Sequence, residues 1–470
     1  MKNILDLTIR ETSDLLSSRQ LKAQELAQAF LESAHELNKK LNSFITICDD
    51  TALNQAKKVD KLIANGQKLN PLAGVPFGIK DLFSTKDIRT TAGSKVLENY
   101  VPVYNATSVE RLKGADAVIV GKTNLDAWAH GSSGENSDYG PTCNPYDFSR
   151  VPGGSSSGSA VSVASGSSLA AMGTDTGGSI RLPASFCNVV GLKPTYGRVS
   201  RYGVIAMASS LDCIGHFTKT VYDNALVLDV TAGEDGLDST CIFQKQDDFT
   251  SDIKKGVKNL KIGLPREYFE KLDQKIKQLI LEAVKKLEKL GSNVDNISLP
   301  HTEYGVATYY IIQPSEVSSN LARYDGVRFG RTREQFGSEA KRRIILGTYT
   351  LSSGYYDEYY LKAMKVRRLI RNDFIKAFQK VDVIICPVSP TLPFRLGGKV
   401  NNPLQMYLAD IFTVTANLAG VPSLAVPCGF INGIPVGMQI IGPDFSEKLL
   451  YQVGHTYEQE TKWYERRPST

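Results

Sequence analysis

Short apolar runs that fit buried strands alternate with helical segments along most of this 470-residue chain. VPFGI (75–79), AVIVG (117–121) and VDVIICP (381–387) are runs of this kind. Residues 260–300 form a complete unit, in which a short strand, an amphipathic helix and a returning strand follow one another. Alternation of this kind predicts an α/β layered fold.

Four successive segments make up the chain. They are N-terminal helices (1–65), a core of strand-like runs split by glycine (66–230), a strand–helix unit followed by helices (255–380), and C-terminal strands with a helix (381–470). One helix face of the third segment carries Leu272, Ile276, Leu279, Ala283, Leu287 and Leu290, and Gly291 is placed to end that helix. In the last segment, Asn432-Gly433 predicts the tight turn of a β-hairpin.

Composition and charge exclude several classes of protein. No stretch approaches the roughly 18 apolar residues of a membrane helix, and the acids in MKNILDLTIRETSDLL do not fit a secretory signal, so we expect a cytoplasmic protein. Seven scattered cysteines without a C-x-x-C pair agree with that. The five histidines are far apart, which argues against a metal site. A net charge of +6 is too diffuse to indicate nucleic-acid binding.

The segment 152–184 is rich in glycine, serine and other small residues, a composition also found in linkers. It contains Val161, Val163, Leu169 and Met172, however, and can therefore bury an apolar face. We expect it to form a loop, a helix and a second loop inside the core.

Ser179, in GTDTGGSIRLPA (173–184), is the candidate nucleophile. Gly177 and Gly178 leave the backbone before it bare, so that consecutive N–H groups can converge on one point. Backbone donors of this kind stabilise the oxyanion of an attacked carbonyl, and Thr176, Gly177 and Gly178 are the candidate donors. The alternative for this motif alone is a glycine turn with a capping serine.

A serine hydroxyl needs a base, and Lys80 in PFGIKDLF is the best candidate. No histidine lies in a segment of small, catalytic-looking residues. A lysine acts as a base only when it is uncharged, and burial behind an apolar strand lowers its pKa. The alternative is a surface lysine at a strand end, paired with Asp81.

Ser155, in PGGSSSGSA (152–160), can connect the two groups. A hydroxyl accepts a hydrogen bond on one side and donates on the other, so it can relay a proton from Ser179 to Lys80. The alternative for this segment is a flexible Gly/Ser loop without a catalytic role. The G-x-S-x-G match at 154–158 lacks a clear preceding strand and a matching late histidine, which argues against a hydrolase elbow.

Taken together, these residues resemble the amidase signature family. GGSSSGSAVSVASGSSLAAMGTDTGGSIRLPA (153–184) is similar to that family's extended pattern throughout, and the spacings from Lys80 to Ser155 and from Ser155 to Ser179 are the family's. The resemblance implies a triad with Ser179 as nucleophile, Ser155 as bridge and Lys80 as base. It also implies a single α/β domain, in which helices cover both faces of a mixed central sheet.

Within this family, the chain most resembles the glutaminase subunits of tRNA-dependent amidotransferases, through GKTNLDAWAHGSSGENSDYGPTCNP (121–145) and LSSGYYDEYYLKAMKVRRLI (351–370), among other segments. The resemblance implies hydrolysis of glutamine and delivery of ammonia to a partner. Two further subunits are implied, a large one that binds tRNA and a small one. ATP and Mg²⁺ are expected at the partner, which amidates Glu on tRNA(Gln) or Asp on tRNA(Asn), and no cofactor is expected in this chain.

Side chains for a free amino acid are also implied. Arg343 would hold the α-carboxylate by a bidentate contact, Asp410 would face the α-ammonium, and Tyr309 or its neighbour Tyr310 would line the pocket. A solvated position in the Lys-Arg-Arg run is the alternative for Arg343. The remaining alternatives for function are a stand-alone amidase of small amides and a scaffold subunit with an inactive site.

Overall fold

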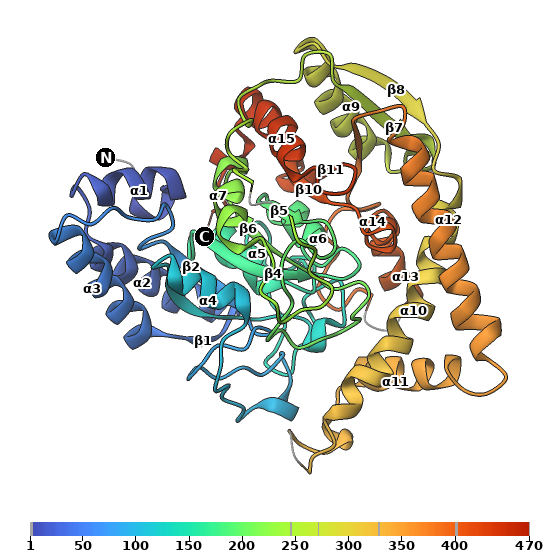
Figure 1. The fold of residues 1–470 in the computed structure, drawn as a ribbon, viewed down its shortest axis with the longest axis horizontal. Coiled ribbons are helices and arrows are strands. Elements are labelled where there is room, and N and C mark those ends of the chain that lie inside the picture. The colour runs from blue at the N-terminus through green and yellow to red at the C-terminus, as the bar shows by residue number, and fades with distance from the viewer. Residues whose placement is uncertain (1–2, 245–246, 271, 328–329, 400–402, 470) are drawn as a thin grey trace.

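The computed structural model describes residues 3–244, 247–270, 272–327, 330–399 and 403–469. Within these ranges the strands form one mixed sheet in the order β1-β3-β2-β4-β6-β5-β10-β11-β9-β7-β8 (Figure 1). The strands are β1 (Phe44–Ile47), β2 (Pro76–Lys80), β3 (Val118–Thr123), β4 (Ala170–Asp175), β5 (Val190–Lys193), β6 (Cys213–Thr218), β7 (Lys261–Pro265), β8 (Asn293–Ile297), β9 (Val383–Pro387), β10 (Ser423–Ile431) and β11 (Ile434–Ile441). The predicted α/β fold with a mixed central sheet is therefore confirmed.

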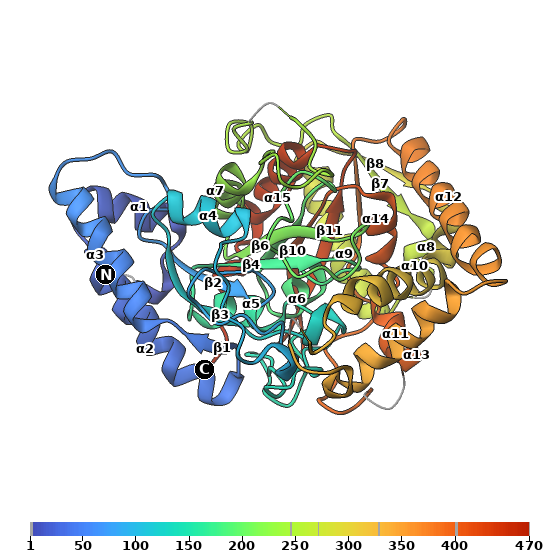
Figure 2. The ribbon, with the colours of Figure 1, turned by 60° about the horizontal axis from the view of Figure 1, so that its bottom comes forward.

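Helices cover both faces of this sheet, as predicted. In Figure 2, α7 and α15 lie above the strands, and α5 and α6 lie below them. The α-helices are α1 (Ile9–Ser17), α2 (Ala23–Leu41), α3 (Asp49–Ala64), α4 (Thr107–Gly114), α5 (Ser157–Ser165), α6 (Arg181–Phe186), α7 (Val221–Thr231), α8 (Arg266–Phe269), α9 (Gln274–Lys289), α10 (Gly305–Asn320), α11 (Ser338–Thr350), α12 (Lys362–Ala377), α13 (Pro403–Tyr407), α14 (Val414–Ala419) and α15 (Glu447–Thr461).

The strand–helix–strand unit forms as its sequence predicts. Asp273 caps α9 by accepting hydrogen bonds from two backbone N–H groups of its first turn, and the apolar face is buried around Ile276, Ile280 and Leu287. The parallel strands β7 and β8 flank this helix in the chain. Asn432-Gly433 forms the turn between β10 and β11, with both residues at positive φ.

Two strands lie where the sequence indicated other structure. β1 interrupts the N-terminal segment that reads as helical, and β4 occupies part of the segment expected to be helix and loop. β4 consists of AAMGTD, whose small residues lack the branched side chains typical of strands. They fit its central position between β2 and β6, because a Cβ added at Gly173 would lie only 2.7 Å from the Phe217 ring. This strand ends directly before the candidate nucleophile.

Candidate active site

Lys80 ends strand β2 and is completely buried. Its Nζ lies 2.8 Å from each of three hydroxyl oxygens, those of Ser155, Ser156 and Thr174. Burial disfavours the charged amine and lowers the pKa of Lys80 to about 7, although three buried aspartates oppose the shift. An amine with this pKa is uncharged in a large fraction of molecules at neutral pH, as a general base requires.

The alternative environment for Lys80, a surface position paired with Asp81, is wrong. Asp81 is completely buried and pairs with Lys122, whose Nζ lies 3.2 Å from Asp81 Oδ1. Lys122 Nζ also donates to the carbonyl of Phe83 and the hydroxyl of Thr90. A second buried lysine therefore neutralises the carboxylate next to Lys80.

Ser155 is free to donate its hydrogen to a neutral Lys80 amine, whereas Ser156 is not. Ser156 Oγ donates its hydrogen to the carbonyl of Thr174 at 3.1 Å, so it can only accept from Lys80. Ser155 follows a cis peptide bond from Gly154 and directs its Oγ at Lys80. It can donate there while its lone pair accepts from another hydroxyl.

Ser179 lies in the turn between β4 and α6, and its side chain is nearly buried. Its carbonyl accepts a hydrogen bond of 3.1 Å from the Ser156 backbone, which holds the nucleophile segment against the Ser155 loop. Across the described ranges, no hydrogen bond joins the hydroxyls of Ser155 and Ser179. The structure thus brings Lys80 and Ser155 into contact, and the transfer from Ser179 to Ser155 stays a prediction. Catalytic hydrogen bonds are often long until a substrate is bound.

Asp175 organises the backbone in front of Ser179. Its carboxylate forms a buried ion pair with Arg181 and accepts the backbone N–H of Gly178 at 2.9 Å. The Gly178 N–H is therefore engaged within the chain, unlike the free oxyanion donor expected from the sequence. Thr176 and Gly177 remain the proposed donors.

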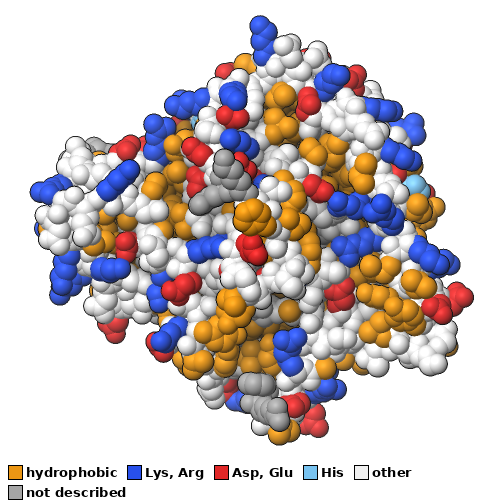
Figure 3. Space-filling view, viewed as in Figure 1, with side chains coloured by type: hydrophobic (Ala, Val, Ile, Leu, Met, Phe, Trp, Pro, Cys, Tyr) orange, Lys and Arg blue, Asp and Glu red, His pale blue; other side chains and the backbone are white. Residues whose placement is uncertain are grey.

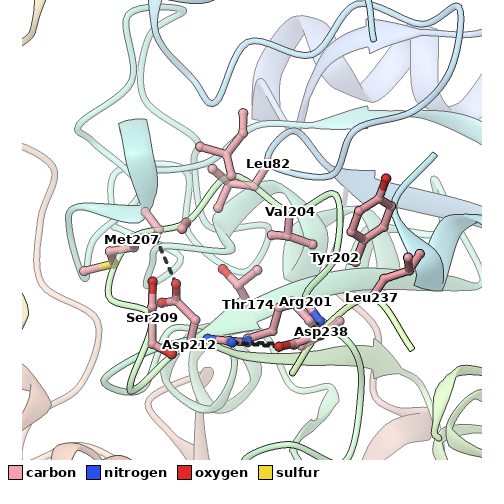
Figure 4. A pocket seen from close by; sticks show the side chains of 14 residues that line it. Leu82, Thr174, Arg201, Tyr202, Val204, Met207, Ser209, Asp212, Leu237 and Asp238 are labelled. Carbon is pink, nitrogen blue, oxygen red and sulfur yellow. Dashed lines mark hydrogen bonds and ion pairs between the residues drawn. The ribbon is translucent and has the colours of Figure 1, made fainter. Parts of the chain in front are cut away.

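A cavity of about 170 Å³ is lined by Thr174 and Asp212, among others (Figure 4). Figure 4 shows Thr174 near the middle of this lining, with the ion pair of Arg201 and Asp238 beside it. Asp212 accepts a hydrogen bond of 2.7 Å from the hydroxyl of Thr176. One of the two remaining oxyanion donors is thus held in place by a buried carboxylate.

The expected ammonium site is a buried carboxylate with two neutral partners. Asp410 Oδ2 accepts hydrogen bonds from Ser132 Oγ at 2.9 Å and from the Tyr310 hydroxyl at 3.2 Å. Burial raises the pKa of Asp410 to about 7. Tyr309 packs against Gly177, where an added Cβ would lie 2.7 Å from its ring. Tyr309 and Tyr310 therefore connect the nucleophile segment to Asp410.

Arg343 is buried, so the alternative of a solvated position is wrong. Its guanidinium lies over the Tyr310 ring at 5.4 Å. Arg343 Nε donates to Glu339 at 2.8 Å and Nη1 donates to Gln313 at 2.9 Å. These bonds engage two of the five N–H groups, leaving one on Nη1 and both on Nη2, so the bidentate contact expected from the sequence stays a prediction.

Sequence reasoning did not identify Ser156, Thr174 and Gln313. The first two lie inside the motifs already singled out, where a run of neighbouring hydroxyls was the available signal. Gln313 lies in α10, 30 residues from Arg343, and nothing in the local sequence indicates that the two side chains meet.

The family model for the amidases matches residues 25–451. The chain belongs to the amidase family. A similar member is the A subunit of glutamyl-tRNA(Gln) amidotransferase from Sulfurihydrogenibium sp., 54% identical over 477 residues that cover 98% of each chain. Another is the corresponding protein from Persephonella marina, 52% identical over 466 residues, 96% of each chain.

Solved amidase-family structures share this fold. The crystal structure of the same amidotransferase component from Thermotoga maritima has a TM-score of 0.85 and 43% identity, and the match covers 98% of this chain and 96% of that one. A 6-aminohexanoate cyclic dimer hydrolase has a TM-score of 0.90 at 24% identity, a likeness of fold alone. The resemblance to the amidase signature family is thus confirmed.

Neither a metal centre nor a membrane span is found in the described part of this amidase-family chain. In those ranges, no group of three or more His, Cys, Asp and Glu residues is placed to hold a metal ion. No helix there is both long enough and apolar enough to cross a bilayer.

Proposed function

We propose that this chain is the glutamine-hydrolysing subunit of a tRNA-dependent amidotransferase, which supplies ammonia to convert Glu-tRNA(Gln) to Gln-tRNA(Gln) or Asp-tRNA(Asn) to Asn-tRNA(Asn). One observation carries the proposal: a buried cation and a buried carboxylate both contact Tyr310, with Arg343 over its ring and Asp410 at its hydroxyl. The pair complements the α-carboxylate and α-ammonium of a free amino acid. A pocket for a small neutral amide has no need of these opposite charges.

The proposed reaction proceeds through an acyl-enzyme. Ser179 Oγ attacks the glutamine side-chain carbonyl while its proton passes through Ser155 to neutral Lys80. Thr176 and Gly177 stabilise the oxyanion, the C–N bond breaks, and the nitrogen leaves as ammonia after taking up the proton. Water then hydrolyses the γ-glutamyl ester, which releases glutamate and restores the Ser179 hydroxyl.

We propose that the reactions on tRNA take place in partner subunits, which bind ATP and Mg²⁺. This chain and the two partner subunits would form a heterotrimer in the cytoplasm. The relatives bear the names of single components of an amidotransferase, which supports the presence of other chains. An exposed apolar face on α11 and the segment before α12 also supports an interface, and Figure 3 shows such residues gathered at its lower right. The exposed residues there are Ile345, Leu346, Tyr349, Tyr355, Tyr356, Tyr359 and Leu361.

Ammonia release from glutamine should rise when the two partner subunits are co-expressed and ATP with Glu-tRNA(Gln) is added. The reason is that a chain which feeds ammonia to a partner wastes glutamine when it works alone. A coupled ammonia assay on the chain with and without its partners measures this. Rapid turnover of small neutral amides by the chain alone, with no response to partners, would support the stand-alone amidase instead.

Arg343→Ala should raise the KM for glutamine roughly 100-fold, because it removes the charged donor proposed for the α-carboxylate. Lys341, an exposed member of the same basic run, offers the matched control Lys341→Ala, which should leave the KM unchanged. Steady-state ammonia release with glutamine and with a neutral amide separates the effects. Equal losses on both substrates would remove Arg343 from carboxylate recognition.

A further inference from the structure

A second cavity, of about 150 Å³, lies beside Arg343, between the loop 130–136 and helix α11. Its lining includes His130, Ser133, Glu135, Glu339, Arg343 and Tyr407. Because Arg343 belongs both to this cavity and to the proposed carboxylate site, the cavity adjoins the recognition end of the glutamine pocket. Thus the side chains around it can decide which ligand Arg343 binds.

His130 is the least satisfied polar side chain of this lining. It is completely buried, and in the described ranges neither ring nitrogen has a hydrogen-bond partner. Gln313 Nε2, on the residue that binds Arg343, is also buried without a partner. Buried polar groups are almost always hydrogen-bonded, so a cluster of unpaired groups around one cation indicates a missing partner.

The electrostatic surroundings of His130 keep its ring neutral. Burial, and then the charge of Arg343, lower the pKa of His130 well below its usual value. A neutral imidazole carries one N–H donor and one acceptor nitrogen. Next to the Arg343 cation, the ring can therefore donate to an anion without adding a second charge to the buried site.

His130 can add a donor beside those that Arg343 still offers. Nε is bonded to Glu339 and Nη1 to Gln313, so Nη2 is the one nitrogen of the guanidinium with both of its N–H groups unengaged. A carboxylate has two oxygens and binds best to two donors. Asp410 is assigned to the α-ammonium, and its Oδ2 already accepts from Ser132 and Tyr310.

We propose that the His130 side chain is a substrate-recognition residue that donates a hydrogen bond to the α-carboxylate of bound glutamine, beside Arg343 Nη2. This inference rests on the proposed glutaminase function. The carboxylate thereby bridges two side chains from separate parts of the fold, the 130–136 loop and α11. His130 acts on binding and takes no part in the proton relay.

The test compares His130→Leu with His130→Asn and His130→Gln. His130→Leu should raise the KM for glutamine about tenfold with little change in kcat, and at least one amide variant should recover most of the loss because it restores an N–H donor. 4-Aminobutanamide, which lacks the α-carboxylate, should be hydrolysed equally by wild type and His130→Leu. In a Ser179→Ala background, calorimetry should give the same tenfold change in the Kd of glutamine.

His216→Leu is the matched control, since His216 is also completely buried with an unpartnered Nδ1 but lies in β6 and bonds Asn224. It should lower the Tm and leave the glutamine KM unchanged. An unchanged KM in His130→Leu, or an equal loss on 4-aminobutanamide, would overturn the inference. Failure of both His130→Asn and His130→Gln to recover glutamine binding would also overturn the inference. If wild type itself releases no ammonia from glutamine, the proposed function fails first.

Discussion

Ser179→Ala should abolish ammonia release from glutamine, with a loss of at least about 10⁴-fold, while the chain stays folded. The loss is large because the Ser179 hydroxyl is the group proposed to form the γ-glutamyl ester. The fold should survive because the Ser179 side chain makes no hydrogen bond in the described ranges, whereas its carbonyl, which alanine keeps, accepts from Ser156. A coupled ammonia assay and circular dichroism measure the two outcomes.

A fluorophosphonate probe, which reacts with activated serines, provides the control for Ser179. It should label wild type and Ser165→Ala, a variant at the far end of α5, but not Ser179→Ala. Ammonia release retained by Ser179→Ala contradicts the assignment of the nucleophile. An unlabelled wild type would support the third hypothesis, a scaffold subunit with an inactive site.

The sequence predicts the fold best where side-chain pattern and local structure agree. The helix α9 and the hairpin of β10 and β11 form where their apolar spacing and turn residues place them. The strand β4 does not, because its small residues are selected by close packing between β2 and β6 and not by strand propensity. Tertiary packing of this kind leaves no periodic signal in the chain.

The residues of the candidate site also fall into two groups, those that the sequence indicates and those whose contacts only the folded chain reveals. Lys80, Ser155 and Ser179 could be proposed from the sequence because glycine-rich motifs mark the two serines, an apolar strand precedes the lysine, and their spacings resemble those of the amidase signature family. The surroundings of Arg343 could not, since Glu339 and Gln313 use two of its three nitrogens through contacts that only the folded chain creates. The same is true of His130, whose missing partners are a property of its burial. Sequence motifs thus indicate the candidate catalytic residues, and the hydrogen bonds around the candidate recognition residues come from packing.

Lys80→Met should lower kcat/KM for glutamine by roughly 10³-fold or more, because it removes the base and keeps a side chain of similar length in the buried position. Lys80→Arg is the informative companion, since a guanidinium keeps the positive charge and cannot give up its proton. Both variants should show this large loss if catalysis requires a neutral amine that accepts the proton. Activity in Lys80→Arg would instead show that a positive charge suffices.

The pH dependence tests the same base without a substitution. The pKa of Lys80 is lowered to about 7 by burial, and the amine must be neutral to accept the Ser179 proton. The active fraction therefore increases as the pH rises, from roughly one tenth at pH 6 to roughly nine tenths at pH 8. kcat/KM for glutamine should rise at least roughly tenfold over this interval, and the rise should be smaller in the residual activity of Lys80→Met, where the ionisation of Asp410, whose pKa is also about 7, still contributes. A profile for wild type that stays flat across pH 6 to 8, or falls, would contradict proton transfer to Lys80.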